Sequence, residues 1–488
     1  MYQKSSQKDE NILSEKQLRE IFINCHDVSF KQIPVNSEGL FQSLLLFYCD
    51  GLTDEQAIQQ VVFTKVKDLY DHHLGEHDLL KIFPQFQKVE SPLTEKEIVN
   101  RVFFGEVFLF FEPANILLSI DLSDSPKRLP EEPNTEVSIR GPRDGLIEDI
   151  STNVSLIRKR LRTNDLCYEQ FFIGDRMKNK VGLLYVESNC EPETIEQIRS
   201  RIKSISSSDI DSTIQLEEVL TQKKKTLFPL FVHTGRPDFA AKALLNGRFI
   251  LLLDGLPNAI IAPINFTFLL NTPEDANTHL AFVFLERILR ICGFVFSIFL
   301  PGFWVAITTF HQDQIPYTLL STIVLTRQGV PFSAGLEAVI MLAIFEIFRE
   351  AGARLPQAIG QTLSVIGGLI IGQAAISAGL TAPGVLVVVG ISVVSNYVLV
   401  DQTLAGSVTL LRFFVLFISI FFGLYGYLIS FFFILVYMAN LKSFNIPYLS
   451  PASPFILKEF KSIFVRTPNG QNQDKPAILK NDGQGSND

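Results

Sequence analysis

One stretch of this chain combines charged side chains with an otherwise apolar helical pattern. It runs from Gly335 to Pro356 and carries Glu337, Glu346, Arg349, Glu350 and Arg354. Charged side chains are costly in hydrocarbon, so in a membrane protein they face protein or water. The chemistry available to this stretch is therefore ion pairing between helices, or the attraction of ions along a water-filled path.

At about 100° per residue, the stretch has two distinct helical faces. Val339, Ala343, Glu346 and Glu350 share one face, and Glu337, Met341, Ile344 and Phe348 share the other. A ring of carboxylates at a pore mouth concentrates cations, and nearby apolar side chains close a pore by excluding water. Alternatively, Glu346 pairs with Arg349 and holds neighbouring helices together. Both hypotheses are open, and Glu337, Met341, Val339, Ala343, Glu346, Arg349 and Glu350 are the candidates for pore lining or assembly.

The charged stretch stands among segments that are long and apolar enough to cross a bilayer, which takes about 20 residues. We predict four full spans, at 291–310, 363–380, 385–400 and 413–439, with 335–350 as a partly inserted helix. Ser364, Gly368 and Gly372 recur every fourth residue, which favours close packing between helices over a gating role. Both ends of the chain are expected in the cytosol, because the tail is basic and the N-terminus has no signal-peptide pattern.

The first 290 residues carry most of the charge, and their elements recur in the same order. Asp27 and Asp165 precede equivalent strands, while Asp50 and Glu187 follow equivalent strands. This repetition predicts a duplicated α/β module. The fold class is thus a duplicated cytosolic α/β N-terminal module followed by an α-helical transmembrane bundle. The expected regions are a disordered tail (1–11), a first module (12–122), a linker (123–145), a second module (146–277), a membrane domain (278–441) and a basic polar tail (442–488).

Weaker candidates lie in the N-terminal part. Arg140 and Arg143, in a Gly-Pro-Arg turn before a helix, suit either anion binding at the helix N-terminus or a surface pair with a carboxylate, and the second is favoured. Asp50 and Glu187 suit ligand contact or helix capping. The spacing of His73 and His77 resembles a metal pair, but Gly75 interrupts it, so we expect no metal site.

Composition excludes some classes of partner. A net charge of −8 argues against nucleic acid, which needs a basic face. The five cysteines show no metal-binding or secretory spacing, which suits a reducing compartment. Common phosphate-loop, zinc-protease and serine-hydrolase motifs are absent, so we expect neither an enzyme nor a cofactor.

Several motifs together resemble the A subunit of spore germinant receptors. They are Arg140-Gly-Pro-Arg-Asp-Gly145, Asp254-Gly255, Gln328-Gly-Val-Pro-Phe332, Phe345-Glu346, Arg349-Glu-Ala-Gly352, Arg354-Leu-Pro356 and Ile371-Gly-Gln373. The resemblance covers roughly residues 40 to 465. It implies a nutrient-triggered receptor in the spore inner membrane, whose A subunits form an oligomeric ion channel. It also implies two partners, a transporter-like B subunit and a lipoprotein C subunit.

The residues add one expectation to this resemblance. If the N-terminal domain is cytosolic, the outer connections are too short for a ligand pocket of several hundred Å³. The main binding site for the nutrient should then lie on a partner subunit. Two alternatives are a secondary transporter whose membrane domain binds substrate and a non-conducting scaffold subunit. The chain is expected to contact membrane lipids in each case.

Overall fold

The structure is a computed structural model, and it describes residues 14–37, 40–64, 83–89, 94–112, 115–123, 141–174, 177–205, 210–221, 226–354 and 372–453. The described residues form two compact units. Unit 1 comprises residues 14–221 and 233–263, and unit 2 comprises residues 226–232 and 264–453. The units divide between 263 and 264, ahead of the domain limit at 277 that the sequence suggests.

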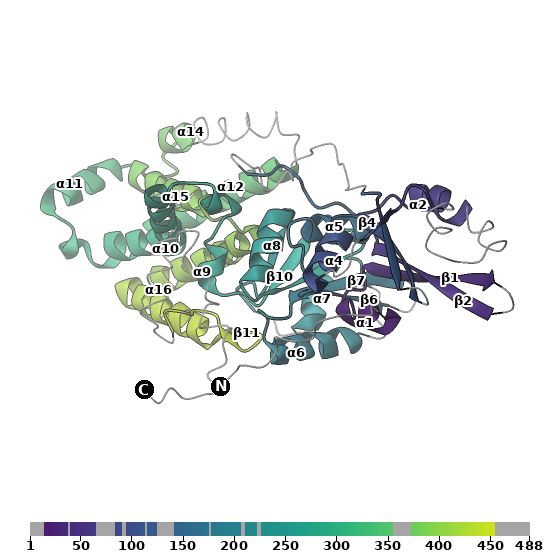
Figure 1. Cartoon of the computed structure of the whole chain (residues 1–488). Helices are drawn as coiled ribbons and strands as arrows, with labels where there is room; N and C mark the ends of the chain where they lie inside the picture. Colours follow the sequence, from purple (N-terminus) through teal and green to yellow (C-terminus); the bar gives the residue numbers. More distant parts are fainter. Residues whose placement is uncertain are drawn as a thin grey trace. The chain divides into compact units, whose positions relative to one another are not determined.

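Unit 1 begins with a five-stranded sheet in the order β1-β2-β4-β5-β3 (Figure 1). Its strands are β1 (Val28–Ser37), β2 (Leu40–Cys49), β3 (Gln87–Lys88), β4 (Glu106–Phe111) and β5 (Ile116–Asp121). Its helices are α1 (Glu15–Ile21), α2 (Glu55–Val61) and α4 (Glu95–Val102). All four strand pairings are antiparallel.

Both faces of this sheet are buried, which explains the continuous apolar run at its centre. In β2, Leu45 and Phe47 belong to the core cluster that includes residues of α1 and α4. Leu44 and Leu46 belong to a second cluster, with Ile58 of α2. Because successive side chains of a strand point to opposite faces, a strand that is covered on both sides needs apolar residues at every position.

The second sheet of unit 1 repeats this arrangement, with the order β6-β7-β9-β10-β8. Its strands are β6 (Leu166–Ile173), β7 (Asn179–Val186), β8 (Val232–Thr234), β9 (Phe249–Leu253) and β10 (Ala259–Ala262). Its helices are α5 (Ile150–Arg158), α6 (Pro192–Lys203), α7 (Thr213–Leu220) and α8 (Pro237–Leu245).

The two sheets thus share one strand order, which is what a duplicated module requires. Local details also correspond. Gly105 before β4 and Gly247 before β9 both have positive φ, at 99° and 80°. The backbone N–H of Asp50 donates to Asp27 O at 2.7 Å, and that of Glu187 donates to Asp165 O at 2.9 Å. The exact limits of the modules stay predictions.

Several elements differ from the sequence-based expectations. Asp54 caps α2 by accepting from two backbone N–H groups, a role for which Thr53 is the other candidate by residue type, while Thr53 donates its hydroxyl to Cys49 O. Helices α4, α7 and α8 were not anticipated. They are only eight or nine residues long, so their apolar periodicity is weak evidence by itself.

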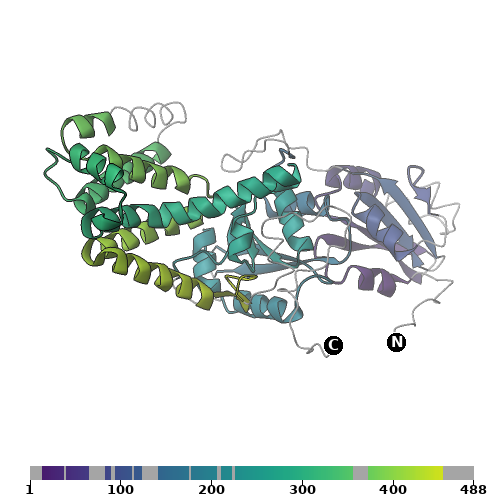
Figure 2. The ribbon, with the colours of Figure 1, turned by 90° about the vertical axis from the view of Figure 1, so that its left-hand side faces the viewer.

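The long helices of unit 2 pack lengthwise against one another (Figure 2). They are α10 (Leu280–Phe310), α12 (Ala334–Arg354), α15 (Pro383–Asn396) and α16 (Gln402–Asn440). The shorter helices α11 (Tyr317–Thr326) and α14 (Gly372–Ser377) belong to the same unit. Short elements complete the unit: α9 (Phe266–Leu269), η3 (Pro273–Ala276), η4 (Gln312–Gln314), β11 (Lys442–Ser443) and β12 (Ile446–Pro447).

Helix α10 continues through Pro301 because a neighbouring helix uses the carbonyl that proline leaves free. Proline has no N–H to donate to the carbonyl four residues earlier, which is that of Ser297. The hydroxyl of Ser392 in α15 donates to Ser297 O at 2.8 Å. Next to the proline, Gly302 allows close approach of α16, since a Cβ there would lie 2.9 Å from Ser419 Oγ.

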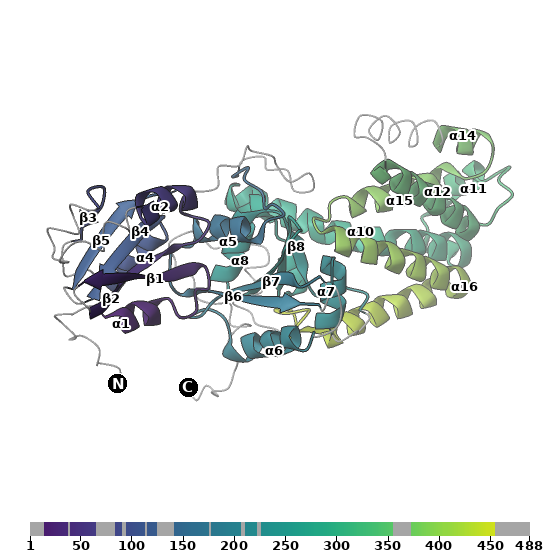
Figure 3. The ribbon, with the colours of Figure 1, turned by 90° about the vertical axis from the view of Figure 1, so that its right-hand side faces the viewer.

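Helix α16 is two helical arms joined by a break at Gly423, where φ is 58° and ψ is −140°. The rings of Phe414 and Phe433 have centroids 5.7 Å apart. An unbroken helix, at about 1.5 Å per residue, would hold these positions about 28 Å apart. The chain therefore reverses at Gly423, and the two arms meet at one end of the unit (Figure 3).

Four full spans are not confirmed. In the described part of the chain, α10 and α16 are long and apolar enough to cross a membrane, whereas α15 has 14 residues. Half of the expected span 363–380 lies outside the described residues. The expected span 413–439 is corrected, because the break at Gly423 divides it into two arms.

Candidate functional site

The charged stretch forms α12, a helix of 21 residues that packs in the centre of unit 2. Ala338, Met341 and Leu342 lie in a core cluster with Val305 of α10 and Leu416 of α16. At about 1.5 Å per residue the helix is about 31 Å long, enough for a full crossing. It therefore extends beyond the stretch 335–350 that we expected to be partly inserted.

Glu337 is fully buried and serves as a connector within unit 2. One carboxylate oxygen accepts from the backbone N–H of Ala382 at 2.8 Å, at the N-terminus of α15. The other lies 2.9 Å from Arg327 Nη2. A carboxylate at a helix N-terminus satisfies free N–H groups and opposes the helix dipole. Glu337 thus joins α12 to α15 and to the end of α11, and Met341 is buried on the same side of α12.

Glu346 takes part in a cluster of charges between α12 and α16. Its carboxylate lies 2.6 Å from Arg349 Nη2 and 3.7 Å from Arg412 Nη2. Arg349 also donates to Thr409 Oγ1 of α16 at 3.0 Å. The geometry of this chain thus agrees with the pairing hypothesis for Glu346, in which the residue connects neighbouring helices.

The side of α12 that lies opposite its core residues Ala338, Met341 and Leu342 is not covered by other described residues. The exposed fraction is 45% for Leu336 and 66% for Ile347, and Ala343 is exposed as well. Glu350 continues this stripe toward the end of the helix, where its exposed carboxylate lies 2.7 Å from Arg354 Nη2. Of the face expected from the sequence, Ala343 and Glu350 are exposed, while Val339 and Glu346 are half-buried.

The small-residue face is only partly described. Gly372 is buried in α14, and a Cβ there would lie 3.2 Å from Leu386 of α15, which fits close packing. Ser364 and Gly368 lie outside the described residues.

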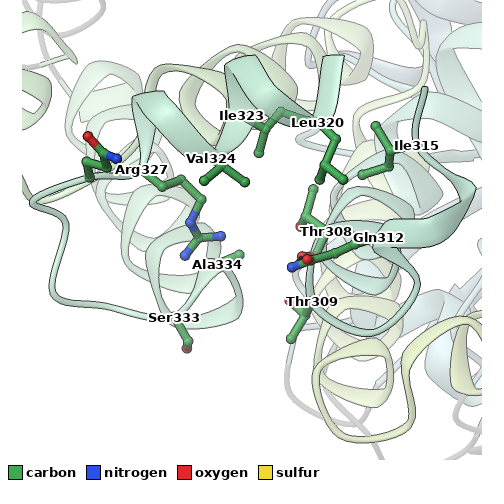
Figure 4. A pocket seen from close by; sticks show the side chains of 11 residues that line it. Thr308, Thr309, Gln312, Ile315, Leu320, Ile323, Val324, Arg327, Ser333 and Ala334 are labelled. Atoms are coloured by element: carbon green, nitrogen blue, oxygen red, sulfur yellow. Dashed lines mark hydrogen bonds between the residues drawn. The ribbon is translucent and has the colours of Figure 1, made fainter. Parts of the chain in front are cut away.

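A pocket of about 360 Å³ lies where α10 ends and α12 begins, with α11 along one side (Figure 4). Leu320, Ile323 and Val324 of α11 form its apolar side, and Thr308 and Gln312 face them. Arg327 also lines it, although its guanidinium already contacts Glu337 and Phe332 O. The connection between α10 and α12 thus forms a helix of its own and lines a pocket of several hundred Å³, whereas the expected outer connections were too short for one.

In unit 1, the proposed anion site at the N-terminus of α5 is already filled by the chain's own carboxylates. Asp149 accepts from Thr152 N at 2.7 Å, and Asp254 accepts from Ile150 N at 3.2 Å. Arg140 lies outside the described residues, and Arg143 is exposed. In the same turn, Asp144 pairs with Arg160 at 2.6 Å, in agreement with the simpler interpretation of a surface pair. The histidines His73 and His77 lie outside the described residues.

Asp50 and Glu187 occupy equivalent turns, but neither caps the following helix, since Asp54 and Glu191 hold those positions. The ligand argument assumed the shared strand ends of a parallel sheet, which antiparallel sheets do not offer. Asp50 accepts from Ser29 Oγ at 2.5 Å. Burial raises the pKa of the Asp50 carboxyl above its usual value, and the Ser29 hydrogen bond opposes this.

The sequence matches the family described as Bacillus/Clostridium GerA spore germination protein over residues 16–478. The chain belongs to the GerA family. Spore germination protein XA of Bacillus anthracis is 43% identical over 470 residues, which cover 96% of each chain. Spore germination protein KA of Bacillus subtilis (strain 168) is 31% identical and covers 93% of this chain and 84% of its own length.

A solved structure is also similar to this GerA-family chain. The N-terminal domain of the A subunit of the Bacillus megaterium spore germinant receptor GerK3 is 24% identical, with a TM-score of 0.38. The match covers 51% of this chain and 93% of that domain.

Two buried ion pairs of this GerA-family chain escaped the sequence analysis because their partners are distant in sequence. Arg158, with no solvent exposure, holds Asp27 through two hydrogen bonds of 2.9 and 2.8 Å. Asp275 of η3 accepts from Arg287 and Arg290 of α10. The signal in the sequence was a charged residue in a segment expected to be buried, because buried charges are paired.

Proposed function

We propose that this chain is the A subunit of a spore germinant receptor, and that several copies assemble with α12 along a shared cation path in the spore inner membrane. Its family and its named relatives are spore germination proteins, which supports the role in germination. The observation that carries the path is the uncovered stripe of α12, which lies opposite the buried face that includes Ala338, Met341 and Leu342.

In this proposal the stripe has an apolar part and an acidic end. Leu336, Ala343 and Ile347 would line a narrow section that closes by excluding water. Glu350, one turn beyond Ile347, would form the ring of carboxylates that concentrates cations. The acidic ring thus belongs to Glu350, whereas Glu346 is engaged with Arg349 and Arg412.

The arrangement of unit 2 supports a topology with both ends in the cytosol. Phe228 contacts Phe294, in the middle of α10 and close to the start of the expected span 291–310, and Tyr437 near the end of α16, with ring centroids 6.5 and 6.1 Å apart. At the far end of α10, Phe310 lies against Gly423. The helices of the unit therefore begin and end on the same side, even with α12 as a full crossing, because α16 reverses.

We expect a transporter-like B subunit and a lipoprotein C subunit as partners, and a partner subunit as the main nutrient site. In the transporter alternative, current requires a substrate gradient, and in the scaffold alternative no current flows. The pocket beside α11 gives the transporter alternative one specific feature to test.

The test is cation flux through vesicles that contain the purified full-length chain. The channel proposal predicts flux without a substrate gradient, and Glu350→Gln should lower the preference for cations over anions severalfold. Asp313→Asn removes an exposed carboxylate of η4 and is the matched control, with unchanged selectivity. Absence of flux from an assembled oligomer would favour the scaffold.

A further inference from the structure

In the charge cluster between α12, α15 and α16, more donors approach one hydroxyl oxygen than it can accept. Arg349 Nη1, Arg412 Nη2 and Asn396 Nδ2 all approach Thr409 Oγ1, at 3.0, 3.3 and 3.5 Å. A hydroxyl oxygen has two lone pairs, so three donors exceed its capacity. Two guanidinium groups and one amide therefore converge on a single neutral oxygen atom.

Arg412 is the least satisfied member of this cluster. Its side chain is 1% exposed, and its Nε and Nη1 atoms have no hydrogen-bond partner among the described residues. Among the described residues, its one ion-pair partner is Glu346, at 3.7 Å, and Glu346 lies closer to Arg349. A buried charge with unused donors is costly, by several kcal/mol in general estimates.

The charges of the cluster also do not balance. Arg349 and Arg412 carry two positive charges, and Glu346 carries one negative charge. The C-terminus of α15 ends at Asn396 and contributes about half a negative charge in partial form. A bound water would satisfy donors but would leave the excess positive charge, whereas an anion would satisfy both.

We propose that this cluster binds one small monovalent anion of chloride size, held by Arg412 and Arg349 with the amide of Asn396. A lipid phosphate is a poorer fit, because the Arg412 side chain is almost entirely enclosed by unit 2. The ion would connect α12, α15 and α16. The site is distinct from the proposed ion path, since Arg412 belongs to α16 and Asn396 to α15, and neither is part of the uncovered stripe of α12.

The test uses the purified full-length chain in detergent, with sodium chloride compared with sodium gluconate at equal ionic strength. Radioactive chloride in equilibrium dialysis should show saturable binding of about one ion per chain. Fluorescence of Trp304, the one tryptophan, should report a thermal midpoint that rises with chloride, because a ligand of the folded state stabilises it.

Three variants separate this site from general salt effects. Arg412→Gln should weaken chloride binding at least tenfold, whereas Arg354→Gln, which removes an exposed arginine of α12, should leave it unchanged. Asn396→Asp places a carboxylate beside the same donors, so it should abolish the chloride dependence and raise the midpoint in gluconate. If Arg412→Gln does not fold, the chloride dependence of the Asn396→Asp midpoint tests the proposal instead.

Equal midpoints in chloride and gluconate without saturable binding would overturn the proposal. So would an Asn396→Asp variant with the chloride response of the unmodified chain. If phosphatidylglycerol stabilises the unmodified chain but not Arg412→Gln, and chloride does neither, the ligand is a lipid headgroup and the free-anion proposal fails.

Discussion

Arg158 connects the two modules of unit 1 through groups that are distant in sequence. Besides its pair with Asp27, it donates to Thr163 O and Leu166 O, and its guanidinium lies 4.1 Å from the ring centre of Phe103. The same junction includes a hydrogen bond from His26 N to Tyr168 O at 3.1 Å. Every charge and donor at this junction has a partner, which makes the loss of one partner costly.

Arg158→Leu should therefore destabilise the chain by about 3–5 kcal/mol, because Asp27 is left buried without a counter-charge. Arg160→Leu is the control, since its pair with Asp144 is partly exposed and worth about 0–1 kcal/mol. Urea unfolding followed by circular dichroism measures both. Similar losses for the two variants would contradict the role assigned to Arg158.

Asp50 gives unit 1 a pH dependence of definite sign. Because its pKa is raised in the folded state, folding favours the protonated form, so stability falls as pH rises from the unfolded pKa through the folded one. Asp50→Asn removes this loss and keeps an acceptor for Ser29. Relative to the unmodified chain, the Asp50→Asn variant should therefore protect its β1 and β2 amides better from hydrogen exchange at pH 7 and equally well near pH 3.

The equivalent residue Glu187 is exposed, so Glu187→Gln is the control and should change the protection of β6 and β7 little. Equal protection of Asp50→Asn and the unmodified chain at pH 7 would show that burial of this carboxylate costs nothing.

Two carboxylates one turn apart on α12 differ in their surroundings. Glu346 is held in a mostly enclosed cluster, and Glu350 is exposed beside Arg354. The same substitution at the two positions therefore separates a structural carboxylate from one that is free to meet ions.

Glu346→Gln should lower the stability of the full-length chain by roughly 3 kcal/mol, because Arg412 loses its counter-charge. Glu350→Gln should change it by less than about 1 kcal/mol. Thermal unfolding in detergent, followed through the helical circular dichroism signal, measures the difference. A stable Glu346→Gln assembly with weaker cation selectivity would instead support Glu346 as the pore carboxylate.

Helix α16 depends on one glycine for its reversal. A Cβ at Gly423 would lie 2.9 Å from the Phe310 ring, in a conformation that other residues rarely adopt. Gly423→Ala should destabilise the chain by about 1–2 kcal/mol from the backbone alone. Gly406→Ala, in open helical surroundings of the same element, should be neutral or stabilising. Differential scanning calorimetry of the two variants tests this contrast.

At the scale of the whole molecule, the proposed topology has an even number of crossings, which would place the tail in the cytosol. We expect an impermeant maleimide to label Gln312→Cys in intact cells, since this residue lies beyond the far end of α10. Lys442→Cys, just after α16, should react only after the membrane is opened. Labelling of Lys442→Cys from outside would show an odd number of crossings and contradict the role of the Gly423 break. Cys292→Ser serves as the background, because the other four cysteines are buried.

The sequence by itself determined the class of the molecule, because composition and periodicity are local properties. The apolar runs indicated membrane helices, the repeated order of elements indicated two modules, and the motifs of α12 and its surroundings indicated the family. The five charges of α12 were visible for the same reason, as exceptions in an apolar pattern.

Tertiary structure decided which partner each charge has and where the chain reverses. Glu337 caps α15, Glu346 meets Arg412, and Arg158 meets Asp27 across distances in sequence that no local pattern encodes. The reversal of α16 depends on the positive φ of Gly423 against Phe310, whereas the sequence there is uniformly apolar. The hydrophobicity of a segment indicates whether it can lie in a membrane. It does not indicate whether the segment is one helix or a helical hairpin, because both bury the same kinds of side chain, and tertiary packing determines which one forms.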